Sequence, residues 1–529
     1  MKTIYISIFV MLATFMLSSC SDFLEVTPTD FVSPENYFNT EKEADMAIAG
    51  AYLKLNSLFA NPLKGSFSAV TDELAYTRLG GDAYMEKTYN SLTPAVSNLW
   101  NALYQGVYYT NFFLDNIDKV SVPDEKKNAL RAEARFLRGY YYYHLAMLWG
   151  DVPLRMKPIN SPLNTSLAKS PRQEVFESVC ADMEYATQHL YTYEKQKGAP
   201  VRICKEGAIG VLARVYLSMA GMLNKPEYFA KARDILIPLV ESNKASNYIK
   251  LTPDYTQIWK NISADAYDHV NKEILFDVDF NADAAKYLYS GWAANVSPAA
   301  PNSSNEAAGY NLSWYSVTIT LWQYYQSDRN DARYTWNICD YSINAAGVKV
   351  PYPAYTANGS NSFSRAAGKF RRDWEIVLPR NKNGNGSNFP ILRYSDVLLM
   401  LSEAEFETNG VTDLALAGVD SVRVRAKAFR YSDKPERPTP EEFRIIIQQE
   451  RARELCFEQP TRYYDLMRWG ILIEKFTEVG NTFKTLAPTS GGPNLANRLY
   501  FNMLPHMLLM PIPYSEIQMN PLVKQNPNW

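Results

Sequence analysis

An apolar stripe between residues 123 and 149 constrains the fold of this chain more than any other feature. Its members recur at spacings of four, three, four, four and three residues, which is the period of one face of an amphipathic α-helix. Gly150 and Pro153 follow directly and end the pattern. The sequence therefore predicts one long helix with a continuous buried face. The stripe consists of Leu130, Ala134, Leu137, Tyr141, Leu145 and Leu148.

Similar periodicity predicts further helices on both sides of this one. Two of them, at residues 206–222 and 227–241, are separated by Asn224-Lys225-Pro226 and carry alanines where two helices would pack closely. A helical pair of about 34 residues in this style resembles a tetratricopeptide unit. The other predicted helices are residues 34–58, 99–117, 172–191, 396–408, 413–428 and 440–457, and residues 274–280 alternate loosely as a strand would.

The first twenty residues have the order of a secretory signal. Met1 and Lys2 form a positive end, residues 4–17 are apolar but too short to span a bilayer comfortably, and small residues lead into Cys20. This order resembles a bacterial lipobox, which implies a signal peptide at residues 1–19 and a lipid on the Cys20 thiol. Such an anchor would hold a water-soluble body on a membrane surface. An ordinary cleaved signal followed by a chance cysteine is the alternative.

Composition and charge argue against several classes of protein. A net charge of −2 and a pI near 6.2 disfavour a nucleic-acid partner, which needs a basic face. The other four cysteines are scattered without a CxxC pair and the four histidines lie far apart, so we expect no zinc site and no cofactor, and the sequence leaves open whether a calcium ion supports a loop. No HExxH, GxSxG, phosphate-loop or dinucleotide motif supports an enzyme. Glycosidase carboxylates leave no local signature, so that class stays open at this point.

Aromatic residues make up 13% of the chain, and their positions divide them into two groups. Those in helical stripes, such as Trp100 and residues 140–143, are predicted to pack in the core. A second group lies in residues 245–395, where helical periodicity is lost and Asn and Ser are frequent. Rings that stack on the apolar face of a sugar, beside amides that bind its hydroxyls, suit a glycan platform, and local packing is the alternative. This group contains Tyr287, Tyr289, Trp292, Tyr310, Trp314 and Tyr315, interspersed with Asn295, Asn302, Asn305 and Asn311.

Several segments, in this order, resemble the SusD/RagB family of outer-membrane nutrient-binding lipoproteins nearly end to end. The most recognisable are "ALRAEARFLRGYYYYHLAMLWGDVPL" at 129–154 and "ERARELCFEQPTRYYDLMRWG" at 450–470, although Gln459 stands where a glycine is expected. The resemblance implies a mostly α-helical fold, a tetratricopeptide-like scaffold with irregular loop-rich insertions that carry the ligand site. It also implies an N-terminal region at 20–245 and a C-terminal region at 246–529, integrated in one fold. The other matching segments are residues 206–221, 389–407, 415–428 and 510–529.

The resemblance also implies a function. Such proteins capture a glycan, less often a peptide, and pass it to a SusC-type TonB-dependent transporter at the outer membrane, facing the cell exterior. They are binding proteins and not enzymes. A structural lid for the transporter, without ligand affinity of its own, is a third possibility. Lys286 is the sole basic residue between 273 and 328, which favours a neutral oligosaccharide. The predicted ligand contacts are Trp292, Trp314, Tyr315, Tyr289 and Asn311, with Asp82, Tyr84 and Tyr89 from an earlier loop at about 78–90.

The charged groups of the 450–470 segment invite a second interpretation. A catalytic acid/base pair needs two groups aimed at one substrate with separated pKa values. Opposite charges three or four residues apart on a helix instead favour mutual ion pairing. The sequence therefore predicts a structural ion network around Trp469. Its members are Glu454, Glu458, Arg462, Asp465 and Arg468.

Overall fold

The structure is a computed structural model that describes residues 38–60, 69–159, 161, 165–281, 290–300, 311–378, 380, 385–458 and 460–529. The signal sequence, the lipidation site at Cys20 and the predicted ligand contact Tyr289 lie outside the described residues. The fold is mostly α-helical, as the sequence predicted. Successive helices of the N-terminal half pack against one another along the chain, and the series continues through α8 onto α13 of the C-terminal half. The helices of this series are α2 (Glu41–Phe59), α3 (Pro94–Asn116), α4 (Asp124–Trp149), α5 (Arg172–His189), α7 (Lys205–Met222), α8 (Glu227–Ser246), α13 (Tyr394–Asn409), α14 (Asp413–Arg425) and α15 (Pro440–Leu455).

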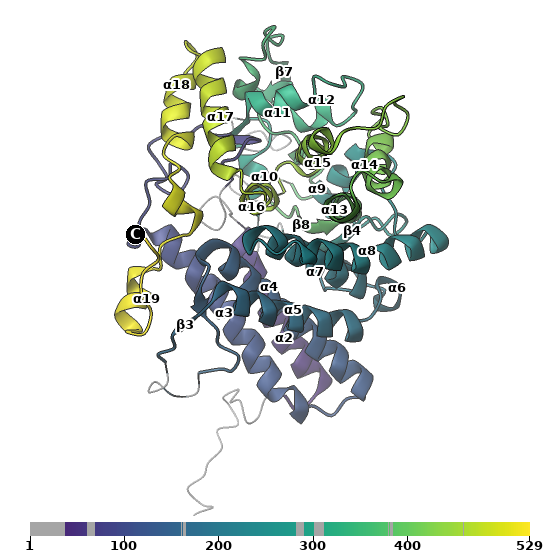
Figure 1. Cartoon of the computed structure of the whole chain (residues 1–529), viewed down its shortest axis with the longest axis vertical. Helices are drawn as coiled ribbons and strands as arrows, with labels where there is room; N and C mark the ends of the chain where they lie inside the picture. The colour runs from purple at the N-terminus through teal and green to yellow at the C-terminus, as the bar shows by residue number, and fades with distance from the viewer. Residues whose placement is uncertain are drawn as a thin grey trace, which may run out of the picture.

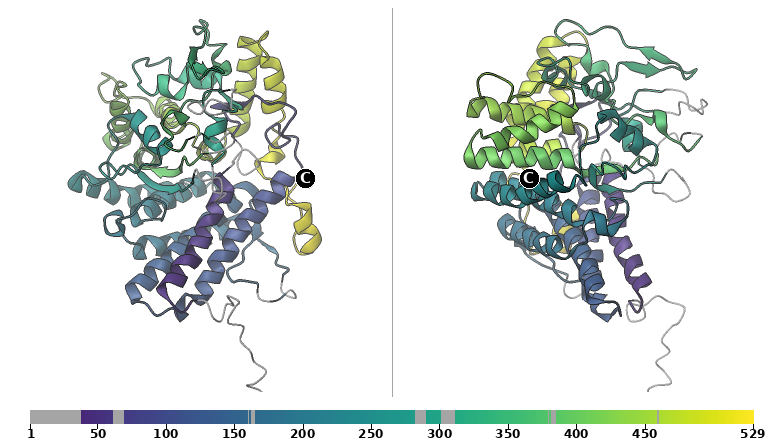
Figure 2. Two further views of the ribbon diagram at one scale, coloured as in Figure 1. Left: turned by 180° about the vertical axis from the view of Figure 1, so that it is seen from behind. Right: turned by 90° about the vertical axis from the view of Figure 1, so that its right-hand side faces the viewer.

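These bounds confirm the predicted helices, although α2 begins at Glu41 and not at Pro34, and α3 begins at Pro94, five residues before the predicted start. Helix α4 spans the predicted apolar stripe and ends at Gly150, whose φ of 76° is accessible to glycine at little cost. The predicted pair α7 and α8 packs side by side after a turn at Asn224, which has a φ of 53°. Figures 1 and 2 show α2, α3 and α4 at the bottom of the molecule, α7 and α8 in the middle, and α13 to α18 above them, whereas α19 lies lower, at one side.

The remaining elements are short and fill the space around this scaffold. The strands of the described residues form two-stranded antiparallel sheets, and the predicted strand at 274–280 is confirmed as one of them. The pairs are β1 (Leu74–Tyr76) with β5 (Tyr315–Val317), β2 (Val152–Pro153) with β3 (Lys169–Ser170), β4 (Ile274–Val278) with β8 (Phe389–Arg393), and β6 (Tyr341–Ile343) with β7 (Lys349–Pro351). The other helices are α6 (Tyr193–Gln196), α9 (Tyr255–Ser263), α10 (Trp292–Asn295), α11 (Ile319–Tyr324), α12 (Tyr334–Asn337), α16 (Thr461–Arg468), α17 (Leu472–Leu486), α18 (Gly492–Leu495) and α19 (Tyr514–Met519).

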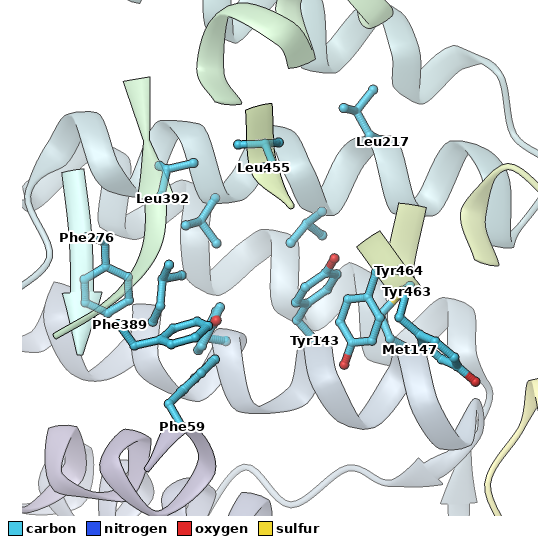
Figure 3. Close-up of a cluster of buried hydrophobic side chains, with 14 of the residues drawn as sticks. Phe59, Tyr143, Met147, Leu217, Phe276, Phe389, Leu392, Leu455, Tyr463 and Tyr464 are labelled. Atoms are coloured by element: carbon cyan, nitrogen blue, oxygen red, sulfur yellow. The ribbon is translucent and has the colours of Figure 1, made fainter. Parts of the chain in front are cut away.

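One hydrophobic core connects the two halves of the chain. Figure 3 shows Phe59 and Tyr143 of the N-terminal helices lying near Phe389 of β8 and Tyr464 of α16. Helices α7 and α16 approach so closely at Gly221 that an added Cβ would lie 1.8 Å from the carbonyl oxygen of Arg468. The small residues that the sequence placed on α7 therefore allow a close backbone approach.

A buried ion network centres on helix α15. The carboxylate of Glu454 accepts hydrogen bonds from Arg333 at 2.9 Å, Arg393 at 2.9 Å and Arg425 at 2.5 Å. Glu458 accepts from Lys369 at 2.8 Å and from Arg393 at 2.7 Å. Burial alone would raise the pKa of Glu454, but the three guanidinium groups outweigh it and hold that pKa well below its usual range. The predicted structural role of Glu454 and Glu458 is confirmed, but their partners come from outside the 450–470 segment and not from charges three or four residues away.

A second cluster of buried ions lies along α16 around Trp469. Arg468 pairs with Asp465 at 2.8 Å and with Glu403, and the indole N–H of Trp469 donates to Glu403 at 2.7 Å. Arg451 of α15 joins Asp465 and Asp396, both at 2.7 Å. Each of these carboxylates is buried and engaged with a cation, which is the arrangement of a structural network.

Breaking one member of the network should destabilise the fold strongly. We expect Glu454→Gln to lower the free energy of unfolding by about 3–5 kcal/mol, because it leaves buried guanidinium groups without their counter-charge. The matched control is Glu441→Gln, the same change at an exposed position in the first turn of the same helix, which should cost less than about 1 kcal/mol. Urea unfolding followed by circular dichroism measures both, and equal midpoints for the two variants would contradict the role of the network.

Candidate ligand-binding site

Strands β1 and β5 bring the earlier loop and the irregular C-terminal insertion together. Tyr76 pairs with Tyr315 across the two strands, and both the backbone N–H and the hydroxyl of Thr77 donate to the carbonyl of Trp314, at 2.8 and 2.9 Å. Arg78 follows, and its guanidinium lies over the Trp314 ring, 4.7 Å from the centroid. Trp314 is partly buried and Arg78 is exposed. This pair places a hydrogen-bond donor over one face of an aromatic ring at the surface.

Two of the predicted platform rings lie in the core instead. Trp292 is 1% exposed, with ring centroids 5.9 Å from Tyr315 and 6.3 Å from Phe389. Tyr315 is fully buried and also packs on Tyr76. Since a stacking platform must present a ring face to solvent, the structure assigns Trp292 and Tyr315 to local packing, the alternative that the sequence left open.

The predicted residues of the earlier loop also serve the fold. Tyr84 and Tyr89 are buried against each other at 5.1 Å, and Tyr89 stacks on the C-terminal Trp529 at 5.3 Å. The carboxylate of half-buried Asp82 accepts the backbone N–H groups of Tyr84 at 2.9 Å and Met85 at 3.1 Å, so it caps the turn. These three residues stabilise the loop, and neither tyrosine presents an exposed ring to a ligand.

Asn311, the last of the described predicted contacts, lies beside Trp314 in the chain. It is buried, its backbone pairs with Ala300, and its amide oxygen accepts from Arg372 at 3.2 Å. The amide oxygen therefore already has a partner, and the structure does not bring it together with Arg78 and Trp314 in any recorded contact.

Several buried polar atoms around Trp314 have no hydrogen-bond partner among the residues that the structure describes. Buried polar groups in folded proteins are normally paired, so such a group requires an ordered water or a ligand. They lie in the two short stretches 292–297 and 315–316, which flank the candidate platform. They are Trp292 Nε1, Asn295 Oδ1, Ser297 Oγ, Tyr315 Oη and Ser316 Oγ.

Arg78 is a candidate that the sequence analysis missed. Its position at the start of the irregular loop could have indicated a binding role. Only the pairing of β1 with β5 shows that its guanidinium contacts Trp314. The loop behind it is braced, because the Glu86 carboxylate accepts the N–H of Gly80 at 2.5 Å and Arg498 Nε at 2.7 Å. The φ of 85° at Gly80 suits glycine, so the turn is built into the sequence.

Two buried acids tie β1 to the core just before this loop. Asp72 binds Arg462 through two hydrogen bonds of 2.8 and 2.5 Å, and Tyr324 donates to it at 2.9 Å. The carboxylate of Glu73 lies 3.7 Å from Arg462 Nε, which is too far for a hydrogen bond, and it accepts the backbone N–H of Phe457 at 3.2 Å. Burial, reinforced by the neighbouring Asp72 charge, raises the pKa of Glu73 to about 8. At neutral pH the pair therefore carries one negative charge against one arginine.

The described part of the chain gives two further facts about possible function. Within it, no three His, Cys, Asp or Glu side chains gather closely enough to hold a metal ion. None of its helices combines the length and the apolar character needed to cross a membrane.

The raised pKa of Glu73 predicts a pH dependence of stability. Between its ordinary pKa of 4.5 and about 8, the folded chain keeps a proton that the unfolded chain has lost. The free energy of unfolding should therefore fall with rising pH across this window, by at most about 1.4 kcal/mol per pH unit from this group. In Glu73→Gln that contribution disappears, so urea midpoints measured from pH 5 to pH 8 should decline less than in the wild type. The Glu441→Gln variant should follow the wild type, and parallel curves for all three chains would contradict the assignment.

Comparisons with known proteins agree with this architecture. The model of the SusD family matches residues 272–529, and a model described as starch-binding associating with outer membrane matches residues 22–217. SusD-like protein P2 of Formosa agariphila is 27% identical, and the alignment covers 100% of both chains; SusD-like protein P25 of the same organism is 26% identical over 99% and 98%. A crystal structure of a SusD homolog from Bacteroides thetaiotaomicron superposes with a TM-score of 0.83 at 25% identity, covering 94% of this chain and 98% of that one. A laminarin-binding SusD-like protein superposes with a TM-score of 0.71 at 21% identity, covering 93% and 100%. The family matches, the full-length relatives and the shared fold together establish that this chain belongs to the SusD/RagB family.

Proposed function

We propose that this chain is a glycan-binding lipoprotein of the outer membrane that captures an oligosaccharide and delivers it to a SusC-type TonB-dependent transporter. Family membership supports the binding role, since relatives of the same fold are named for laminarin binding and for surface glycan binding. The leader that ends at Cys20 supports the lipid anchor, which would face the cell exterior. Binding, and not catalysis, is its activity.

The observation that carries the proposal is the surface pair of Trp314 and Arg78. An indole face stacks on the C–H face of a sugar ring, and a guanidinium offers several N–H donors to neighbouring hydroxyls. The unpaired buried atoms in residues 292–297 and 315–316 lie beneath the platform, where ordered waters can satisfy them. The ligand of this site is a neutral oligosaccharide.

The carboxylates of the 450–470 segment support binding over hydrolysis. Glu454, Glu458 and Asp465 are each held by arginine or lysine at 2.5–2.9 Å. A glycosidase needs one carboxyl with a raised pKa and a second that faces the same bond. The paired carboxylates of this segment do not meet that requirement.

Calorimetric titration tests the proposal directly. A chain with Cys20→Ser, which carries no lipid, is titrated with laminarin and starch oligosaccharides, an acidic oligosaccharide and short peptides. We expect saturable binding of one neutral class, with an affinity in the micromolar to millimolar range because a shallow platform buries little area.

Replacement of the platform should then weaken that binding selectively. We expect Trp314→Ala to reduce affinity about tenfold through loss of stacking, and Arg78→Ala about three- to tenfold through loss of charge-assisted hydrogen bonds. The control is Tyr248→Ala, because that ring also lies under a cation, Lys272 at 4.0 Å, but belongs to another part of the surface. Unchanged affinity in both platform variants would refute the site. Binding of peptides alone would favour a peptide-binding family member, and no binding by the wild type would favour a transporter lid without ligand affinity.

A further inference from the structure

A second cavity lies far along the chain from Trp314, between helix α3, the loop that follows β2 and the C-terminal helix α19. It encloses about 580 Å³, within the range of small-ligand sites. Trp100, Tyr104 and Tyr108 of α3 form its aromatic wall, and Pro153 and Met519 lie among its other apolar residues. The cavity shares no lining residue with the Trp314 platform.

The aromatic wall is held in place by its own contacts. Trp100 is 2% exposed and packs edge-on against Trp149 at 5.1 Å. The hydroxyl of Tyr104 donates to the carbonyl of Pro153 at 2.8 Å. Tyr108 is 45% exposed and its ring stacks on Phe112 at 6.3 Å. The wall is therefore formed before any ligand arrives, which lowers the entropic cost of binding.

Asn520 supplies the observation that points to a ligand. It lines the cavity and is 3% exposed. Its amide nitrogen donates to the carbonyl of Leu167 at 2.9 Å and to Glu516 Oε1 at 3.0 Å, and these two acceptors determine which way the amide is turned. The amide oxygen is then left without a partner among the described residues. A buried acceptor without a partner is unfavourable, so a ligand hydroxyl that reaches this oxygen, which lies just beneath the cavity surface, is favoured here.

The remaining polar groups narrow the class of that ligand. Asn101 and Gln105 are exposed on α3 at the edge of the aromatic wall, and Glu516 adds one carboxylate. Of the two lining cations, Arg155 already donates to the carbonyl of Thr165. Lys157 is the second cation, so the lining carries two cations and one carboxylate. The amides beside the aromatic rings can bind hydroxyl groups while the rings contact C–H faces, which is the chemistry of a sugar.

We propose that this cavity is a second saccharide-binding site, which takes a short neutral sugar with its C–H face on Tyr108 and a hydroxyl donating to Asn520 Oδ1. The ligand class rests on the proposed function, but the site does not depend on the Trp314 platform. Two sites on one molecule give a long glycan a greater avidity than a short one, because the second contact becomes intramolecular where one chain reaches both sites.

The experiment uses the Cys20→Ser chain and the trisaccharides laminaritriose, maltotriose and cellotriose, with a tripeptide of neutral residues as the other probe. Calorimetry gives stoichiometry and affinity, and crystals soaked with the bound trisaccharide locate it. We expect two trisaccharides per wild-type chain, and one per chain in Tyr108→Ala. Tyr108→Phe should restore the second site, because the ring face carries the contact.

Tyr109→Ala is the matched control, since Tyr109 is the next residue on α3, is 39% exposed and does not line the cavity. It should bind as the wild type does. Melting temperatures of all variants confirm that the fold is kept, which is expected because Tyr108 is largely exposed.

The outcomes separate this site from the platform. If Tyr108→Ala binds as the wild type and soaked crystals show no sugar against Asn520, the second site is refuted, whatever Trp314→Ala does. If the wild type binds one trisaccharide, Trp314→Ala binds it unchanged and Tyr108→Ala binds none, the second site is supported and the platform is refuted. Binding of the tripeptide, but of no trisaccharide, at Tyr108 overturns the saccharide class.

Discussion

The buried charges on helix α15 are the constraint on which the rest of the structure depends. Arg333, Arg393 and Arg425 converge on Glu454, and none of these side chains reaches solvent. Buried ions are costly to desolvate, so an arrangement that leaves one of them unpaired is strongly disfavoured. The network closes only when α15, β8, α14 and the segment before α12 are all in place. It therefore selects one arrangement of the C-terminal half more than it adds to stability.

A separate buried ion pair anchors the strands beneath the candidate platform. Arg462 of α16 binds Asp72 immediately before β1, and β1 pairs with β5, which follows Trp314. A single arginine faces two acids there, and burial together with the neighbouring Asp72 charge raises the pKa of Glu73. Arg78 and Trp314 themselves make few contacts. They lie at the ends of β1 and β5, and these strands are anchored in the charged core. A binding loop on such a support can remain irregular and still be held in position.

The aromatic residues show how much of the site could be predicted. The sequence placed the ligand contacts in the irregular insertion and in the loop at 78–90, and the structure brings these two segments together at Arg78 and Trp314. It could not separate Trp314 from Trp292 and Tyr315, because an aromatic ring suits a core and a platform equally well and no periodicity marks the difference in a loop. Arg78 and Asn520 were missed for a related reason, since a single polar residue has no pattern and its role appears only when distant segments meet.

The sequence by itself determined the helices of the scaffold and the family, because periodicity and ordered motifs can be read along the chain. It also indicated that the charges of the 450–470 segment are structural, but not which distant residues pair with them. Only the tertiary structure decided which rings are buried, which cation reaches Trp314 and where Tyr108 and Asn520 enclose a cavity. These features depend on contacts between residues hundreds of positions apart, such as Asp72 with Arg462 and Asn520 with Leu167. Burial is a property of the packed molecule, and no local pattern in the chain records it.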